Sequence, residues 1–347
     1  MPIVNGAYVA PTWNNDAPPA INAAELQDIC DTIETYDTSK ANVSYVNTFV
    51  RPNLLDNAYF VGGGSQQGNG QFPVNQRGAT AYNASGYTID RWQVGINNAV
   101  AVQSDCVKIT DQSGNHQNWK IFTQKIANAD QYRGKTLTMS ILCGDTVTAG
   151  LAKPLIRVET NGTYVDQTMG DFLSANTVAK VTWTIPTSGT FDTIVVGVMH
   201  DAQKTGSYKI KGMKLELGDA QTLAHQESGV WVLNEVPNFE VELAKCQRYD
   251  YLNTNGMSQF IRAAYIAANA IYFDFPVPVP MRAGVVYTVL SSGQIGVFNM
   301  AGAAQTGFTF AVQNAYGGSL RITATKTSHG LSDAYLSVSK TLFSSAL

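Results

Sequence analysis

The chain has little charge: 23 basic and 26 acidic side chains make up only 14% of its 347 residues, whereas soluble domains average about 25%. The net charge of -3 gives no basic surplus of the kind that nucleic-acid-binding proteins carry. No apolar run reaches the roughly 18 residues that a membrane-spanning helix needs. Disorder is also excluded, because 44% of the residues are hydrophobic. The composition therefore predicts a folded protein with a surface of amides and hydroxyls, and no nucleic acid or membrane insertion.

The motifs of common catalytic and metal sites are missing as well. The four cysteines (Cys30, Cys106, Cys143 and Cys246) lie far apart, and the four histidines are scattered, whereas zinc ligands usually arrive as closely spaced pairs. No GxSxG, HExxH or phosphate-binding loop occurs. The acidic residues are spread over strand ends and turns, although a glycosidase needs two carboxylates beside one bond. We expect no enzyme, no metal and no cofactor, with a site assembled between chains left open.

No secretory signal is recognisable at the start of the sequence. Together with unpaired cysteines, this favours synthesis in a reducing cytoplasm.

The first fifty residues differ in pattern from the rest. Asn22 and Glu25 form a capping box, and a heptad of mixed apolar and polar positions follows. Its core positions are Leu26, Ile29, Ile33, Tyr36, Lys40, Val43, Asn47 and Val50. The pattern favours a short coiled coil through which copies of the chain associate. The alternative is one amphipathic helix that lies on its own domain.

From Pro52 onward the hydrophobic pattern has period two, which is typical of strands. In the first β region, strands are predicted at 107–109, 119–122, 136–141, 155–158, 181–185, 194–198 and 208–213. No helical stretch separates them, so an antiparallel sandwich is expected rather than βαβ units. A short helix is predicted from Asn238 to about Tyr251. In the second β region, strands are predicted at 270–275, 285–290, 308–312, 320–324 and 335–338.

Several strings resemble those of one family. They are NLLDN at 53–57, FPVNQRG at 72–78, GYTIDRW at 86–92, KGMKLELG at 211–218 and ELAKCQRY at 242–249. As a group, and in this order, they resemble tail-fibre and receptor-binding proteins of bacteriophages and prophages. WNN at 13–15 and INAAEL at 21–26 look like the segment by which such proteins join a tail. The resemblance runs from about residue 11 to residue 282 and fades beyond it.

The resemblance implies a mainly β homotrimer with its N-terminus on a phage tail or baseplate protein and its C-terminus outward. It also implies that the first β region is a jelly roll similar to carbohydrate-binding modules. The expected division is a tail-attachment helical segment at 1–51, the jelly roll at 52–225, a connector with a short helix at 226–253 and a C-terminal β tip at 254–347 that binds the host receptor. Such a protein would act in the virion, on a host-surface polysaccharide or glycoconjugate.

Four residues of the matched strings suggest an internal network. Asp90, Arg91 and Trp92 put opposite charges beside an aromatic ring at the start of a strand, and Arg77 could join them. Half-buried ion pairs of this kind usually anchor loops. We therefore interpret these residues as fixing the path of the N-terminal loop across the sandwich, and a ligand site is the less favoured interpretation.

Three polar loops with aromatic or imidazole rings are the glycan-binding candidates. Sugar recognition places an aromatic ring on the apolar face of a pyranose and amides or carboxylates on its hydroxyls. The candidate residues are Asn314, Tyr316, His329, Asp333, His116, Asn118 and Trp119. The alternative is that these are ordinary polar turns, with Trp119 at the start of a core strand.

Function is therefore predicted as non-enzymatic attachment of a phage tail to a host glycan. A structural baseplate or connector component is the first alternative. A polysaccharide depolymerase is the second, and a secreted adhesin is a more remote one.

Overall fold

In the computed structural model, the described residues are 3–4, 7–8, 51–63, 71–114, 119–200, 203–253, 259–281, 285–315 and 319–345. By its contacts the chain divides into two units, Met1–Val50 and Arg51–Leu347. In the first unit, β1 (Ile3–Val4) pairs antiparallel with β2 (Ala7–Tyr8). The predicted helix lies outside the described residues, with its core positions Leu26, Ile29, Ile33, Tyr36 and Val43. The coiled coil and the trimer therefore stay predictions.

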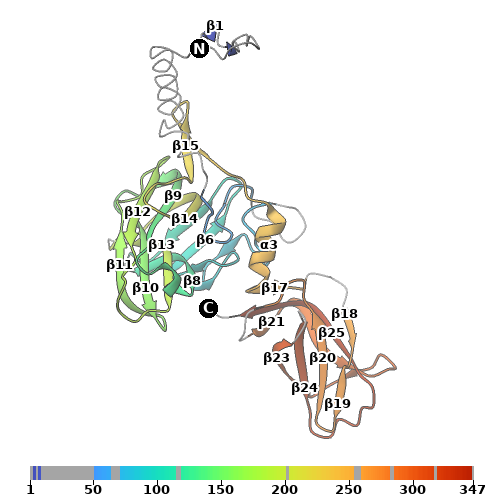
Figure 1. Ribbon diagram of the computed structural model, residues 1–347. Helices are drawn as coiled ribbons and strands as arrows, with labels where there is room; N and C mark the ends of the chain where they lie inside the picture. The colour runs from blue at the N-terminus through green and yellow to red at the C-terminus, as the bar shows by residue number, and fades with distance from the viewer. Residues whose placement is uncertain are drawn as a thin grey trace, which may run out of the picture. The chain divides into compact units, whose positions relative to one another are not determined.

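Two six-stranded antiparallel sheets form the first sandwich of the second unit (Figure 1). The β8 sheet contains, in spatial order, β11 (Thr163–Met169), β10 (Ala152–Thr160), β13 (Thr193–His200), β8 (Trp119–Ala127), β5 (Gln93–Val94) and β4 (Gly86–Tyr87). The β14 sheet contains β12 (Val178–Thr184), β9 (Thr136–Val147), β14 (Gly206–Leu217), β7 (Val107–Asp111), β6 (Asn98–Val102) and β3 (Ala81–Tyr82). The 3-10 helix η1 (Ala129–Tyr132) follows β8. The predicted antiparallel β architecture is confirmed.

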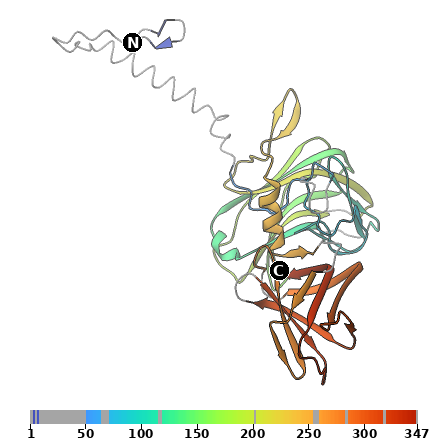
Figure 2. The same ribbon diagram turned by 90° about the vertical axis from the view of Figure 1, so that its right-hand side faces the viewer.

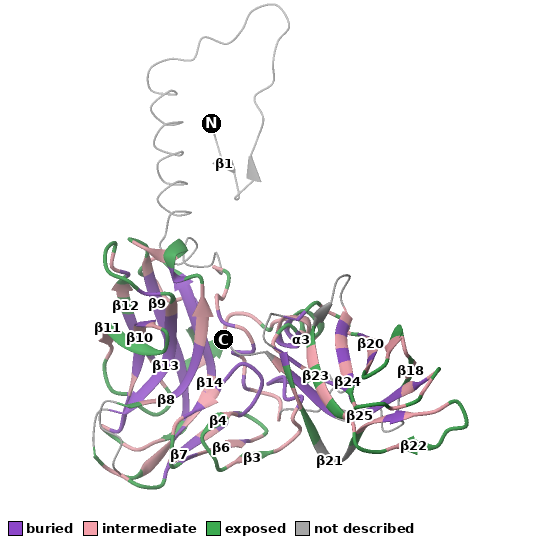
Figure 3. Cartoon of the chain, turned by 90° about the horizontal axis from the view of Figure 1, so that it is seen from below, coloured by how far each residue is buried: buried purple, intermediate pink, exposed green. Residues whose placement is uncertain are grey.

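The core of this sandwich lies between the two sheets, where Figure 3 shows buried residues along the inner strands. Trp92 stacks on Phe122 with ring centroids 4.7 Å apart, and Phe60 meets the Trp92 ring edge-on at 5.5 Å. All three side chains are fully buried. Each such side chain contributes about 1.5–3 kcal/mol through burial of apolar surface, so this aromatic cluster is a main source of stability.

A hairpin and one α-helix follow the first sandwich (Figure 2). The hairpin pairs β15 (Ala224–Glu227) with β16 (Val230–Leu233). Helix α3 (Phe239–Gln247) begins after Asn238, whose side chain accepts a hydrogen bond from Val241 N, as N-cap residues do. The helix is shorter than predicted, because the chain enters a strand at Asp250.

Two further antiparallel sheets form the second β region. The β25 sheet contains β17 (Asp250–Leu252), β25 (Tyr335–Ser345), β21 (Val285–Phe298) and β22 (Ala304–Gln305), with β18 (Gln259–Arg262) also paired to β25. The β24 sheet contains β19 (Tyr265–Ala267), β20 (Ala270–Pro276), β24 (Ser319–Thr325) and β23 (Thr309–Ala315). A separate hydrophobic cluster, including Phe273, Phe275 and Phe343, fills the space between them. The predicted four-part division of the chain stays a prediction.

The described cysteines, Cys106, Cys143 and Cys246, are buried free thiols, and Cys30 lies outside the described residues. Within the part of the chain that the structure describes, no helix has the length and apolarity to cross a bilayer.

Candidate functional site

A buried ion network joins the first sandwich to the β25 sheet. Arg77 Nη1 lies 3.3 Å from Asp90 Oδ1, and Arg77 Nη2 lies 3.0 Å from Asp250 Oδ1. The Asp90 side chain is completely buried and also accepts a hydrogen bond from Gln76 N. Burial raises the pKa of Asp90 to about 7, with a further contribution from the charge of Asp250, while Arg77 opposes the shift. The Arg77 guanidinium thus forms ion pairs with two carboxylates. The pKa of one of them, Asp90, lies near neutral pH.

The two residues after Asp90 hold other parts of the chain. Arg91 Nε lies 3.1 Å from Asp56 Oδ2, and its guanidinium lies 3.4 Å from the centre of the Tyr249 ring. Trp92 Nε1 donates to Asn57 O at 2.8 Å. Arg91 and Trp92 therefore contact the N-terminal loop at Asp56 and Asn57, while Asp90 pairs with Arg77.

The candidate loop residues that the structure describes differ in their hydrogen-bond partners and in their exposure. His329 Nε2 lies 2.7 Å from Ala267 O, and Leu331 N donates to Nδ1 at 3.1 Å, so both ring nitrogens are held by backbone groups. Asp333 accepts two hydrogen bonds from Arg262, at 2.7 and 3.3 Å, and this interaction lowers the Asp333 pKa. Trp119 begins β8 with 46% of its side chain exposed.

The remaining candidates cannot be placed with these. Tyr316, His116 and Asn118 lie outside the described residues, and so does the side chain of Asn314.

The outer face of the β25 sheet carries a group of aromatic side chains that sequence reasoning missed. Phe260 lies opposite Ser337 in the register, and Phe298 lies opposite Tyr335. The inner face of the same strands carries residues such as Leu336, which belongs to the core, so the alternation of a strand puts the aromatic residues on the other face. Phe260 is 60% exposed. Its ring meets that of Phe298 edge-on, with centroids 5.6 Å apart.

Polar groups lie among these rings. Gln294 Nε2 donates to Ser337 Oγ at 2.7 Å, and Gly296 lies opposite Ser337, which leaves no side chain above the strand at that point. The Arg262–Asp333 pair closes one end, since Arg262 lies opposite Tyr335. We call Phe260, Phe298, Tyr335 and Gln294 the aromatic face; Ser337 lies in the same sheet but is completely buried. An exposed ring beside an amide can pack on a sugar ring and bond its hydroxyls.

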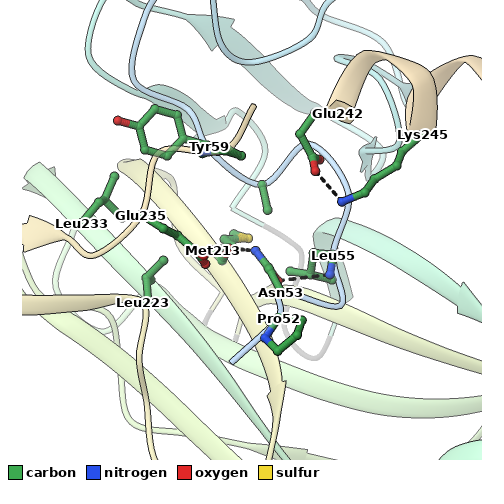
Figure 4. Close-up of a pocket in the computed structure, with 12 residues that line it drawn as sticks. Pro52, Asn53, Leu55, Tyr59, Met213, Leu223, Leu233, Glu235, Glu242 and Lys245 are labelled. Atoms are coloured by element: carbon green, nitrogen blue, oxygen red, sulfur yellow. Dashed lines mark hydrogen bonds and ion pairs between the residues drawn. The ribbon is translucent and has the colours of Figure 1, made fainter. Parts of the chain in front are cut away.

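A pocket of about 250 Å³ lies where the N-terminal loop meets β14, the segment after the hairpin and α3 (Figure 4). It is lined by apolar side chains such as Leu55, Tyr59 and Met213, and by Glu235, Glu242 and Lys245. Glu235 is paired with Lys214 at 2.8 Å. Glu242 is paired with Lys245 and accepts a hydrogen bond from Asn57 N. Each carboxylate in this pocket therefore already has a cationic partner.

Among the described residues, no cluster of three or more His, Cys, Asp and Glu side chains could hold a metal ion.

No family model matches the chain, and no curated protein matches it. Solved structures do match. One is the C-terminal family 22 carbohydrate-binding module of Clostridium thermocellum Xyn10B, at 16% identity and a TM-score of 0.26, covering 39% of this chain and 94% of that one. Another is the tandem CBM22-1-CBM22-2 domain of Paenibacillus barcinonensis Xyn10C, at 9% identity and a TM-score of 0.28, covering 76% of this chain and 97% of that one. With both TM-scores below 0.5, the chain is similar to these modules only at a level that assigns neither a family nor a ligand.

Proposed function

We propose that the chain is a non-enzymatic receptor-binding protein of a phage tail or tail fibre, which attaches the virion to a glycan on the host surface. The observation that carries the proposal is the aromatic face, where Phe260 is 60% exposed beside Phe298. Exposed apolar side chains that lie together on a surface often mark a binding site. The resemblance of the strings at 53–57, 72–78, 86–92, 211–218 and 242–249 to phage tail proteins supports the place of action.

The remaining parts of the proposal follow from the same resemblance. The chain would be made in the host cytoplasm, assemble as a homotrimer and join a tail or baseplate protein through its N-terminal segment. Its distal β regions would meet the receptor.

The chemistry of the aromatic face fits a neutral, hydroxylated ligand. In the described part of the face, the only charged side chains next to these residues are Arg262, which lies opposite Tyr335, and Asp333. They neutralise each other through two hydrogen bonds. Gln294 supplies an exposed amide, which can donate and accept hydrogen bonds. A sugar without carboxylate or sulfate groups therefore meets no uncompensated charge here.

The test is binding of the full chain to a panel of neutral host glycans, followed by the substitution Phe260→Ala. Removal of a central aromatic contact should weaken binding about tenfold or more. The matched control is Tyr265→Ala, because Tyr265 is similarly exposed at 64% but lies in the β24 sheet. Equal losses from both substitutions, or no loss from Phe260→Ala, would contradict the assignment of the site.

A structural connector is the second candidate, and one observation favours it. Val230, Val236 and Val241, on the hairpin and near the start of α3, are 64%, 73% and 53% exposed, as expected of residues that meet another tail protein. A connector would neither bind susceptible cells nor compete with adsorption of the particle. The third candidate, a depolymerase, would release new reducing ends from host polysaccharide, which a purely binding protein would not.

A further inference from the structure

The second β region contains a long stretch of sequence without charge. Between Arg282 and Arg321 there is no Asp, Glu, Lys, Arg or His. The chain as a whole is 14% charged, so a stretch of this length is expected to carry several charged side chains. Both β21 and β23 lie within it. The surface that these two strands form is therefore uncharged.

The same two strands lie at sheet edges. On one side β21 pairs with β25, and on its other side only Val297 and Phe298 pair with a described strand, β22. Among the described strands, β23 pairs with β24 alone. The two strands contact each other although they belong to different sheets, so both edges belong to one side of the second β region. We call residues 285–296 of β21 together with β23 the uncharged edge.

The uncharged edge differs from the other described sheet edges. Proteins protect exposed edge strands by keeping them short, by placing charged side chains on them or by bending them with bulges. In the first sandwich, β3 and β4 have two residues each, and β11 and β12 carry the exposed residues Asp166 and Lys180. In contrast, β21 has 14 residues and β23 has 7, without one charge. The register shift of β21 between Val289 and Gln294 leaves residues 285–289 in regular pairing with β25.

Apolar side chains of the uncharged edge are exposed. Val286 is 61% exposed and Val289 is 38% exposed. On β23, Ala311 is exposed, whereas its neighbours Phe310 and Val312 pack on the core. A strand that presents apolar side chains beside a backbone edge without a described partner strand is a template for association with another chain.

The absence of charge favours a second copy of this chain as the partner. Where identical chains meet around a symmetry axis, a side chain near the axis lies close to the same side chain of the other copy. A charged residue there would face its like, which is unfavourable. A different protein could supply the opposite charge, so its binding surface has no need to be uncharged. Interfaces between identical chains are accordingly more apolar than other interfaces.

We propose that copies of the chain associate through the uncharged edge, so that each copy covers the β21 and β23 edges of another. The inference rests on the homo-oligomer of the proposed function and names the surface that its copies share. It leaves Phe260 of the aromatic face free for a glycan, because β18 and β21 pair with opposite sides of β25.

The experiment measures association of the full chain by sedimentation at several protein concentrations. The variant is Val286→Lys, which places a charge on the uncharged edge. The matched control is Val230→Lys, because Val230 is also a strand valine, 64% exposed, but lies in the hairpin. Val286→Lys should raise the concentration at which half of the chains are associated about tenfold or more, and Val230→Lys should leave it unchanged. Ala311→Lys, on β23, should act as Val286→Lys does.

Hydrogen exchange gives a second measurement, which still reports on the edge if the N-terminal segment holds the copies together. The amides of residues 285–289 should exchange faster in Val286→Lys than in the natural protein or in Val230→Lys. An oligomer in which the two variants behave alike in both measurements would overturn this inference alone. A natural chain that is monomeric at every concentration would overturn it together with the proposed homotrimer, and would leave glycan binding through Phe260 to its own test.

Discussion

Arg77 Nη2 lies 3.0 Å from Asp250 Oδ1, and this buried ion pair joins a loop of the first sandwich to the first strand of the β25 sheet. The same guanidinium lies 3.3 Å from Asp90, so one side chain balances two carboxylates that belong to distant parts of the sequence. Gln76 strengthens the connection, since its side-chain amide donates to Asp250 O.

Arg77→Met should therefore destabilise the protein strongly. The substitution leaves Asp90 and Asp250 buried without their cation, and breaking a buried pair in this way typically costs about 3–5 kcal/mol. Urea unfolding followed by circular dichroism measures the change. Lys209→Met is the control, because its partner Asp145 is 63% exposed and a surface pair contributes little. Similar effects of the two substitutions would show that the buried network does not stabilise the fold.

Asp90 should make stability depend on pH in an unusual direction. Burial raises its pKa to about 7 in the folded protein, whereas the unfolded chain has the ordinary value of about 3.9. The folded state thus binds a proton that the unfolded state releases, and this contribution to stability is lost as pH rises towards and through 7. Between pH 5.5 and pH 8 the loss amounts to about 2 kcal/mol.

Asp90→Asn removes that titration. Unfolding free energies measured at several pH values should fall from pH 5.5 to pH 8 in the natural protein and stay flatter in the variant. A fall of the same size in both proteins would assign the pH dependence to other groups.

The sequence predicted the class of fold because its strands are long and strongly patterned. Residues 194–198, for example, are all apolar or glycine, and they form the centre of β13, a strand buried on both faces. By contrast, β11 was missed, because none of its residues is buried and no alternation appears. The predicted helix extends to about Tyr251, yet Tyr251 pairs with Phe343 in the β25 sheet. Long-range strand pairing overrode a local pattern there.

The candidate site was harder to predict than the fold. Phe260 and Phe298 belong to strands that both pair with β25, and a period of two shows which residues share a face but not which strands are neighbours. The same holds for Asp90 and Arg91, which are adjacent in sequence but bond different partners. Turn composition, the signal used for the loops, identifies polar residues without showing what they bond.

Gly197 marks a close approach of two backbones in the β8 sheet. Its φ is 146°, and a Cβ built on it would lie 2.1 Å from Phe122 O. Gly197→Ala should therefore separate β13 from β8 and destabilise the protein by about 3 kcal/mol or more, measured by urea unfolding. Gly296→Ala is the control, since its Cβ would meet only a Phe298 ring carbon at 3.6 Å. An unaffected Gly197→Ala protein would mean that the two strands can separate at little cost.

His329 should contribute to stability rather than to binding. Leu331 N donates to its Nδ1, so the proton of the neutral ring sits on Nε2 and is donated to Ala267 O. His329→Ala removes both hydrogen bonds from the turn after β24 and should cost about 1–3 kcal/mol, seen as a lower Tm. Glycan binding measured well below that Tm should be unchanged, because the side chain is fully engaged with the backbone. His225→Ala, at an exposed hairpin position, serves as the control for Tm. If His329→Ala instead abolished binding and left Tm unchanged, the loop at 327–333 would contact the receptor, as its sequence alone suggests.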